Sequence, residues 1–144
     1  MGMHIEGTGN IIRNNQVVNT GGSSINTSAY GILPYGPGSS ITNNDIINTV
    51  EQTGGYSIGV YAFTCNGCAI ENNRISNSAP GPGTSWGVDI TSSSNVTAIN
   101  NRISTVDIGI YYVSPSTGKY RDNLTGADVT TPYSGGTAIG TTNY

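Results

Sequence analysis

A repeated pair of asparagines constrains this chain more than any other feature. Similar phrases recur around a second asparagine at Asn15, Asn44, Asn73 and Asn101, and a shorter variant ends at Asn123. Successive copies are 29, 29, 28 and 22 residues apart. A period of this length is typical of stacked repeats, in which each repeat buries its hydrophobic face only against its neighbours. The pattern therefore predicts a solenoid rather than an ordinary globular domain.

A second column, made of glycines, runs between the asparagine pairs. It consists of Gly31, Gly59, Gly87 and Gly109. From each glycine to the next second asparagine the distance is 13 or 14 residues, whereas the distance from that asparagine to the next glycine varies from 16 down to 8. Insertions are tolerated where the backbone is solvated. Each coil therefore has a constant half and one connection of variable length.

Each repeat divides into three short strands, and no segment has a sustained helical period. A strand of a stacked coil pairs with the same strand of the next coil, so neighbouring strands are parallel and about 4.8 Å apart. Alternation along the strands predicts two inward stacks of aliphatic side chains. They are Ile32, Val60, Val88 and Ile110, and Val17, Ile46, Ile75 and Ile103.

The asparagines themselves are explained by this stacking. A buried amide costs several kcal/mol unless it is hydrogen-bonded. In a column, each amide can donate to the carbonyl of the next and also satisfy the backbone of the turn. Asparagine also tolerates the left-handed conformation that tight corners require. We therefore expect the column to be a structural ladder and not a functional site.

The phrase Ile41-Thr42-Asn43-Asn44-Asp45-Ile46 and its copies resemble the short repeats of right-handed parallel β-helices of the pectate-lyase-like superfamily. The resemblance covers residues 11–124. It implies an all-β fold, a right-handed parallel β-helix of about five coils with three short strands per coil and an internal asparagine ladder. The whole chain, residues 1–144, then forms one domain, in which residues 120–144 close the last coil. The fold does not settle the activity, because it carries lyases, hydrolases and adhesins alike.

The resemblance also implies that ligands lie along the glycine-containing strands. Alternation predicts a set of outward side chains there, which are Leu33, Tyr35, Tyr61, Phe63, Asp89, Thr91, Tyr111 and Val113. Flat aromatic rings complement the apolar faces of sugars. We therefore take Tyr35, Tyr61, Phe63, Asp89 and Tyr111 as a candidate carbohydrate-binding set, with the glycine column leaving room for close approach. The alternative is that these residues are ordinary exposed β residues that stack because the repeats stack.

A second outward row follows the asparagine pairs and carries opposite charges. It consists of Gln16, Asp45, Arg74 and Arg102. One interpretation is a surface ion pair between Asp45 and Arg74. The other is that Arg74 and Arg102 bind the carboxylate of an acidic sugar, because a guanidinium group binds a carboxylate with two parallel hydrogen bonds.

The residues favour a non-catalytic module that binds carbohydrate or presents a surface for assembly. Asp45, Asp89 and Asp107 lie in different repeats, whereas hydrolases of the family cluster their aspartates, and the single histidine, His4, precedes the repeats. We expect no catalytic residues, no metal site and no cofactor. The alternative is a polysaccharide lyase or glycoside hydrolase, or a fragment of one.

Cys65 and Cys68 form the one Cys-x-x-Cys motif. One pair cannot complete a tetrahedral zinc site. A redox motif would need the start of a helix beside it, and no helical pattern follows. The two residues are expected at a corner, either as thiols or closed into a small loop.

The remaining expectations concern partners and location. A net charge of −3 with five basic residues argues against nucleic acid, and no apolar run is long enough to span a membrane. A polysaccharide is the expected partner. Few residues precede the first repeat, so its strand edges are open to pairing, and we expect a homo-oligomer joined through the N-terminal coil or a longer chain. The chain begins without a signal peptide, and the resemblance favours an extracellular or periplasmic location.

Overall fold

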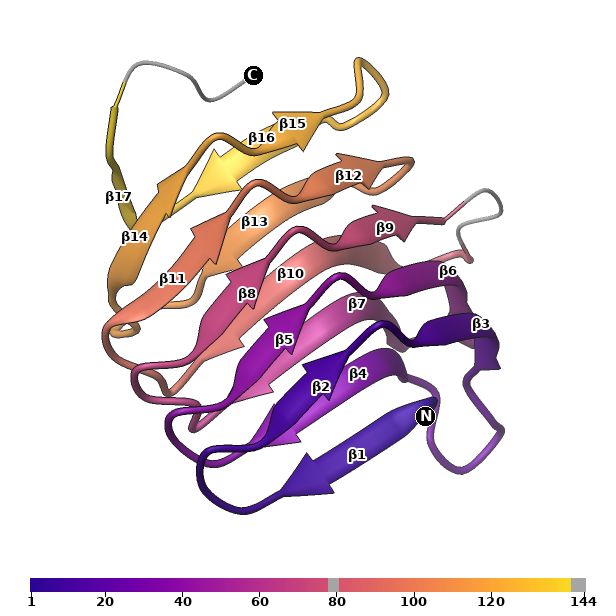
Figure 1. Cartoon of the computed structure of the whole chain (residues 1–144). Coiled ribbons are helices and arrows are strands. Elements are labelled where there is room, and N and C mark those ends of the chain that lie inside the picture. Colours follow the sequence, from indigo (N-terminus) through magenta and orange to yellow (C-terminus); the bar gives the residue numbers. More distant parts are fainter. Residues whose placement is uncertain (78–80, 141–144) are drawn as a thin grey trace.

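The computed structural model describes residues 1–77 and 81–140, and the regular elements in this part of the chain are all β-strands. They form three parallel sheets that stack into a helix of strands (Figure 1). The last four residues of the expected closing segment, 141–144, lie outside the described residues.

Each sheet takes one strand from every coil. Sheet A contains β1 (Met3–Glu6), β4 (Ala29–Tyr35), β7 (Tyr56–Phe63), β10 (Thr84–Thr91), β13 (Ile108–Tyr112) and β16 (Thr131–Ser134). Sheet B contains β2 (Ile11–Arg13), β5 (Ser40–Thr42), β8 (Ala69–Glu71), β11 (Val96–Ile99), β14 (Gly118–Arg121) and β17 (Thr137–Ala138). Sheet C contains β3 (Gln16–Gly21), β6 (Asp45–Val50), β9 (Arg74–Ser76), β12 (Arg102–Ser104) and β15 (Leu124–Thr125).

The chain winds in a right-handed sense. In Figure 1 the strands of sheet B pass along the near side from left to right, and those of sheet A return behind them as the chain climbs away from its N-terminus. This is the hand that crossover connections between parallel strands adopt almost without exception. The described strands make five complete coils, and β16 and β17 begin a sixth. The predicted all-β, parallel β-helix is therefore confirmed.

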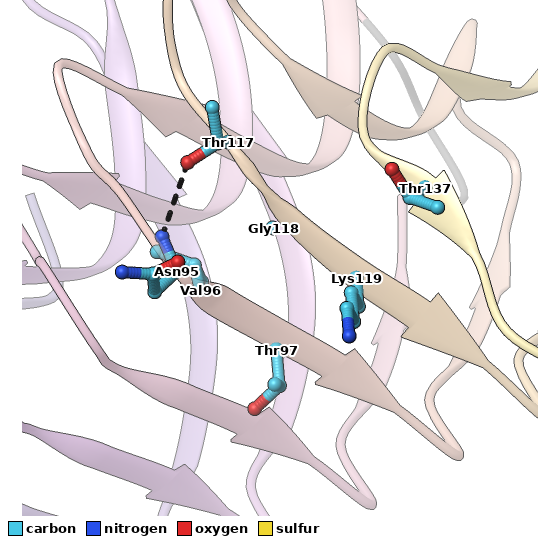
Figure 2. Close-up of a pocket in the computed structure, with 7 residues that line it drawn as sticks. All are labelled: Asn95, Val96, Thr97, Thr117, Gly118, Lys119 and Thr137. Carbon is cyan, nitrogen blue, oxygen red and sulfur yellow. Dashed lines mark hydrogen bonds between the residues drawn. The ribbon is translucent and has the colours of Figure 1, made fainter.

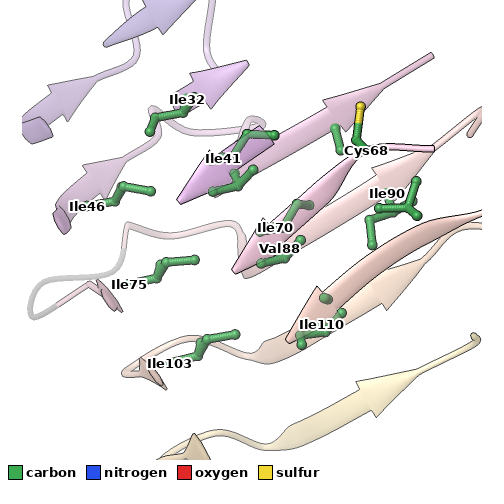
Figure 3. Packing of buried hydrophobic residues seen from close by; sticks show 14 of the residues in the cluster. Ile32, Ile41, Ile46, Cys68, Ile70, Ile75, Val88, Ile90, Ile103 and Ile110 are labelled. Carbon is green, nitrogen blue, oxygen red and sulfur yellow. The ribbon is translucent and has the colours of Figure 1, made fainter. Parts of the chain in front are cut away.

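Aliphatic side chains fill the interior in columns (Figure 3). The strands pair in register, so that Ile32 lies beside Val60 and Ile46 beside Ile75. Both predicted inward stacks are buried, with exposures between 0% and 8%. Each fully buried Ile or Val contributes about 1.5–3 kcal/mol relative to an exposed one. The repetition of such residues at every coil is what makes short strands sufficient for a continuous core.

The asparagine ladder is present and continuous. In each step the Nδ2 of one asparagine donates to the Oδ1 of the next at 3.0 Å, from Asn15 through Asn44, Asn73 and Asn101 to Asn123. The backbone N–H of each residue donates to the same oxygen, at 2.9–3.1 Å. The amides of the last four also donate to a backbone carbonyl one coil earlier. The ladder therefore satisfies buried polar groups of both side chain and backbone.

The two asparagines of each pair have different tasks. The first takes the left-handed conformation at the corner, with φ between 53° and 57° for Asn14, Asn43, Asn72 and Asn100. In the fifth copy Asp122 replaces it, with φ 54°. Asn and Asp adopt this conformation more readily than other side chains do. The corner and the ladder therefore need adjacent residues, which explains why the motif is a pair.

The glycine column packs against the core and is not open to the outer face. A Cβ atom on Gly31, Gly59 or Gly87 would lie 2.5–2.7 Å from the carbonyl oxygen of the next glycine and 2.5–2.6 Å from the Cγ2 of a core isoleucine. The expectation that these glycines leave room for a ligand is therefore wrong. Each glycine and the aliphatic residue after it both face the core, so strict alternation is interrupted at this position.

Three tyrosines close the core at its C-terminal end. Tyr112, Tyr120 and Tyr133 pack on one another, with ring centroids 6.4 and 4.6 Å apart. The Tyr112 hydroxyl donates to the carbonyls of Val96 and Lys119, and burial raises the pKa of Tyr112. In the expected closing segment, β16 pairs with β13 and β17 with β14, both in parallel. Aromatic rings therefore take the place of the aliphatic stacks at this end.

Cys65 and Cys68 form a disulfide at a corner, which makes the small closed loop the correct alternative. Both side chains are buried in the core cluster. The Cys65 N–H donates to the Ser93 hydroxyl at 2.9 Å, and the Ser39 N–H donates to the Cys68 sulfur at 3.3 Å. The disulfide therefore joins the corners of the coils before and after it.

Candidate functional site

The outer face of sheet A carries most of the aromatic side chains that lie outside the core. We define the aromatic face as Tyr30, Tyr35, Tyr56, Tyr61, Phe63, Trp86 and Tyr111. These residues lie on the four adjacent strands β4, β7, β10 and β13. Each is half-buried or exposed, so the face combines packed rings with solvent access.

The rings form two connected clusters. In the first, Tyr61 lies 5.1 Å from Tyr30 and 5.6 Å from Phe63, and Phe63 lies 5.6 Å from Tyr35. In the second, Trp86 stacks on Tyr56 at 4.8 Å and contacts Tyr111 at 6.1 Å. Such contacts add about 0.5–1.5 kcal/mol each beyond the area that they bury. The rings are therefore held in place before any ligand arrives.

Sequence reasoning found only part of this face. It placed Tyr35, Tyr61, Phe63 and Tyr111 correctly, because they follow the glycine in their strands. It missed Tyr30, Tyr56 and Trp86, because alternation carried backwards across the glycine assigns them to the core. The sequence does contain a signal that two of them lie on the same face. Tyr30 and Trp86 each directly precede a glycine of the column, and they are 56 residues apart, which is two repeats.

Two covered aliphatic side chains lie among the strands that carry the rings. Leu33 and Ile58 are only 8% and 2% exposed, although neither belongs to the core cluster. Ile58 lies in register between Tyr30 and Trp86 on the neighbouring strands. Leu33 was expected as an outward residue, and the structure shows that it is covered. The strands of the aromatic face therefore carry buried aliphatic side chains that lie outside the main core cluster.

Asp89 lies within the aromatic face, in register between Tyr61 on β7 and Tyr111 on β13. It was predicted as an exposed site residue, but it is only 4% exposed. The Thr91 hydroxyl donates to its Oδ1 at 2.6 Å. Burial raises the pKa of Asp89 to about 6, and the hydrogen bond from Thr91 opposes that rise. Burial and the charge of Asp89 together raise the pKa of Tyr61.

Arg74 and Arg102 lie on the outer face of sheet C, away from the aromatic face. The Arg74 guanidinium binds the Asp45 carboxylate through Nε and Nη2, both at 2.5 Å, so the predicted ion pair is present. Arg102 lies in register beside Arg74. The two arginines line a shallow groove of about 210 Å³ with Ser76, Ser104 and Leu124. Their binding of an acidic sugar stays a prediction, and it would belong to a site separate from the aromatic face.

A larger groove of about 390 Å³ lies on sheet B (Figure 2). Thr97, Lys119 and Thr137 line it from three adjacent strands, and the Asn95 N–H donates to the Thr117 hydroxyl at 3.3 Å. Gly118 lies in its lining, where a Cβ atom would overlap the Val96 carbonyl oxygen and the Tyr112 ring, so the neighbouring strands pack closely there. This groove presents one ammonium group and several hydroxyls, with neither a carboxylate nor an aromatic ring in its lining.

Two carboxyl groups, the buried Glu51 and the exposed Asp107, hold the connections around the aromatic face, and Glu51 had no signal in the sequence. Glu51 is 1% exposed; it accepts hydrogen bonds from the Ser57 hydroxyl and, at 2.5 Å, from the Gly83 N–H. Asp107 accepts from the N–H and the hydroxyl of Ser85 at 2.7 and 2.9 Å. Ser57 and Ser85 lie next to Tyr56 and Trp86 in sequence. Both carboxyl groups therefore position backbone, Glu51 from the interior and Asp107 from the surface.

Fold and site together define a class: a parallel β-helix with an aromatic outer face. Searches against protein-family models, curated proteins and solved structures returned no match to the chain. The resemblance to the pectate-lyase-like superfamily is therefore supported at the level of the parallel β-helix alone. Among the described residues there is no helix long and apolar enough to cross a membrane, and no group of three or more potential metal ligands.

Proposed function

We propose that this protein is a non-catalytic carbohydrate-binding β-helix module. The observation that carries the proposal is the aromatic face, in which seven rings form two packed clusters on four adjacent strands. The distance across these strands is three strand spacings, about 14 Å. That length suits a short stretch of a polysaccharide, and the resemblance to polysaccharide-acting β-helices supports this ligand class.

The chemistry of the face fits sugars better than it fits a protein partner of apolar character. Tyrosine rings present an apolar surface for the C–H groups of a sugar and a hydroxyl at the rim for its O–H groups. Tyr30, Tyr61 and Tyr111 supply three such hydroxyls. Packing of the rings on one another restricts them, so little conformational entropy is lost when a ligand binds.

Asp89 is the one observation that favours a glycoside hydrolase, because a carboxyl group with a pKa of about 6 suits a general acid. Hydrolysis by the usual mechanisms also needs a second carboxyl group within about 10 Å. The other carboxylate in the strands of sheet A is Glu6 on β1, three strands from β10, which is about 14 Å. This spacing favours binding over hydrolysis.

The Cys65–Cys68 disulfide supports a location in an oxidising compartment, outside the cytosol or in a periplasm, because such bonds persist there. A polysaccharide ligand fits the same location. Both points are part of the proposal.

A glycan array followed by titration of the best ligand tests the function. Tyr61→Ala and Tyr111→Ala should each weaken binding by roughly tenfold, because each removes a ring contact worth about 1–2 kcal/mol. Ile25→Ala is the matched control, since Ile25 is an apolar residue in the connection between β3 and β4 that is 93% exposed. Circular dichroism verifies that each variant is folded. Unchanged affinity in both tyrosine variants would contradict the proposal, and release of reducing ends or unsaturated sugars would support the enzymatic alternative.

A further inference from the structure

The charged residues are distributed unevenly over the three sheets. The chain has five basic residues. All five lie on strands of sheets B and C: Arg13 on β2, Arg74 on β9, Arg102 on β12, and Lys119 and Arg121 on β14. The described strands of sheet A contain no Lys or Arg, and their ionisable side chains other than tyrosine are His4, Glu6 and Asp89. The aromatic face is therefore the one described sheet surface without a basic side chain.

Asp89 is open on one side only. Its Oδ1 accepts the hydrogen bond from Thr91. Its Oδ2 has no hydrogen-bond partner among the described residues, and this oxygen is not fully enclosed by protein atoms. With an exposure of 4%, the residue therefore presents a narrow patch of carboxylate oxygen at the surface of the aromatic face. Tyr61 and Tyr111 are the register partners of Asp89 on the two neighbouring strands.

The Asp89 carboxylate has no cationic partner among the described residues of sheet A. Burying a charge without an opposite charge is costly, and no described cationic group of sheet A offsets the cost. Aromatic rings around the carboxylate attract cations through their negative faces. A positively charged group that reaches Oδ2 would meet both attractions at once, whereas an anionic sugar would be repelled.

We propose that the aromatic face selects a glycan that carries a positively charged amine, with Asp89 as the partner of that amine and Tyr61 and Tyr111 as the rings beside it. This inference rests on the proposed carbohydrate-binding function and names its ligand class, an amino sugar with a free amine. Neutral sugars still stack on the rings but gain no ion pair. Uronic acids and sulfated sugars are disfavoured on this face.

The same arrangement predicts how binding depends on pH. The groups that face Asp89 are the Thr91 hydroxyl on its own strand, Tyr61 on β7 and Tyr111 on β13, and none of these is cationic. Because the pKa of Asp89 is about 6 in the free protein, the carboxylate is charged above that pH and becomes neutral below it. Affinity for an amine that stays protonated over this range should therefore fall as the pH is lowered through 6, while affinity for a neutral sugar should not.

Calorimetric titration of the full chain at pH 7 with four hexasaccharides tests the inference. The probes are hexamers of glucosamine, N-acetylglucosamine, glucose and galacturonic acid. The glucosamine hexamer should bind roughly tenfold more tightly than the two neutral hexamers, as expected for one charge-assisted hydrogen bond. The galacturonate hexamer should bind most weakly. Equal affinity for amine and neutral hexamers would overturn the amine preference and leave the carbohydrate function intact, whereas absence of binding to all four would count against both.

Asp89→Asn removes the charge and keeps a side chain of the same shape that can still bond to Thr91. In this variant the affinity for the glucosamine hexamer should drop to the neutral level, and the affinity for the glucose hexamer should not change. Glu71→Gln removes one negative charge from sheet B and is the matched control for general attraction of a cationic polymer to an acidic protein. An equal loss in both variants, or a preference that survives in Asp89→Asn, would overturn the role of Asp89.

Discussion

At the scale of single residues, the stability of this fold depends on side chains that satisfy several groups at once. Asn73 is 1% exposed, and its side chain and backbone N–H take part in five hydrogen bonds with neighbouring coils. Asn15, at the N-terminal end of the ladder, is half-buried, and its side chain and backbone N–H only donate. An asparagine in the middle of the ladder therefore contributes more to stability than the asparagine at its N-terminal end.

Asn73→Ala should lower the free energy of unfolding by about 3–5 kcal/mol, because it leaves one amide hydrogen of Asn44, the Asn44 backbone N–H and the Ile41 carbonyl without these partners. Asn15→Ala should cost about 1 kcal/mol, since the backbone N–H of residue 15 still donates to Asn44. Guanidinium denaturation of the two variants measures the difference. Equal losses would show that the ladder does not act through buried hydrogen bonds.

At the scale of the strand, the glycine column determines how sheet A is built. By directing two successive residues into the core, it turns Tyr30 and Trp86 to the outer face. The rings of the aromatic face then meet across neighbouring strands. The glycines therefore influence the candidate site indirectly, through the direction of the side chains that precede them.

Gly59→Ala should lower the free energy of unfolding by about 1–3 kcal/mol, because its Cβ would overlap the Cγ2 of Ile75 and the carbonyl of Gly87. Gly21→Ala is the matched control in β3, where a Cβ would meet nothing within 4 Å. The control should change stability by less than about 1 kcal/mol. Thermal denaturation followed by circular dichroism compares the two. Tolerance of both substitutions would contradict the packing explanation.

At the scale of the whole molecule, the two ends of the helix differ. Tyrosines cover the core at the C-terminal end, whereas β1, β2 and β3 are the outermost strands of their sheets at the other end. The outward edge of such strands presents unpaired N–H and carbonyl groups, which favour pairing with another strand. Ile11 on β2 adds an apolar side chain at that end. We therefore retain the proposal of a homo-oligomer through the N-terminal coil.

Light scattering after size-exclusion chromatography tests the oligomer, which should dissociate on dilution. Ile11→Lys should weaken it, because a charge near the edge strand opposes pairing with a second copy. Ile25→Lys is the matched control, since Ile25 is 93% exposed in the connection between β3 and β4. A monomer at all concentrations, or equal effects of the two variants, would contradict an oligomer through this end.

The sequence by itself determined the architecture of this protein: the parallel β-helix, the aliphatic stacks, the asparagine ladder and the variable connection. It could do so because equivalent residues of successive repeats stack in register. The repeat spacing along the chain therefore gives the neighbours in the structure directly. Only the tertiary structure decided which residues share a face and how deeply they are buried. Asp89 is buried between the strands that carry Tyr61 and Tyr111, and Tyr30 and Trp86 are turned outward beside the glycines. These properties depend on contacts between side chains of neighbouring coils, which no single repeat contains.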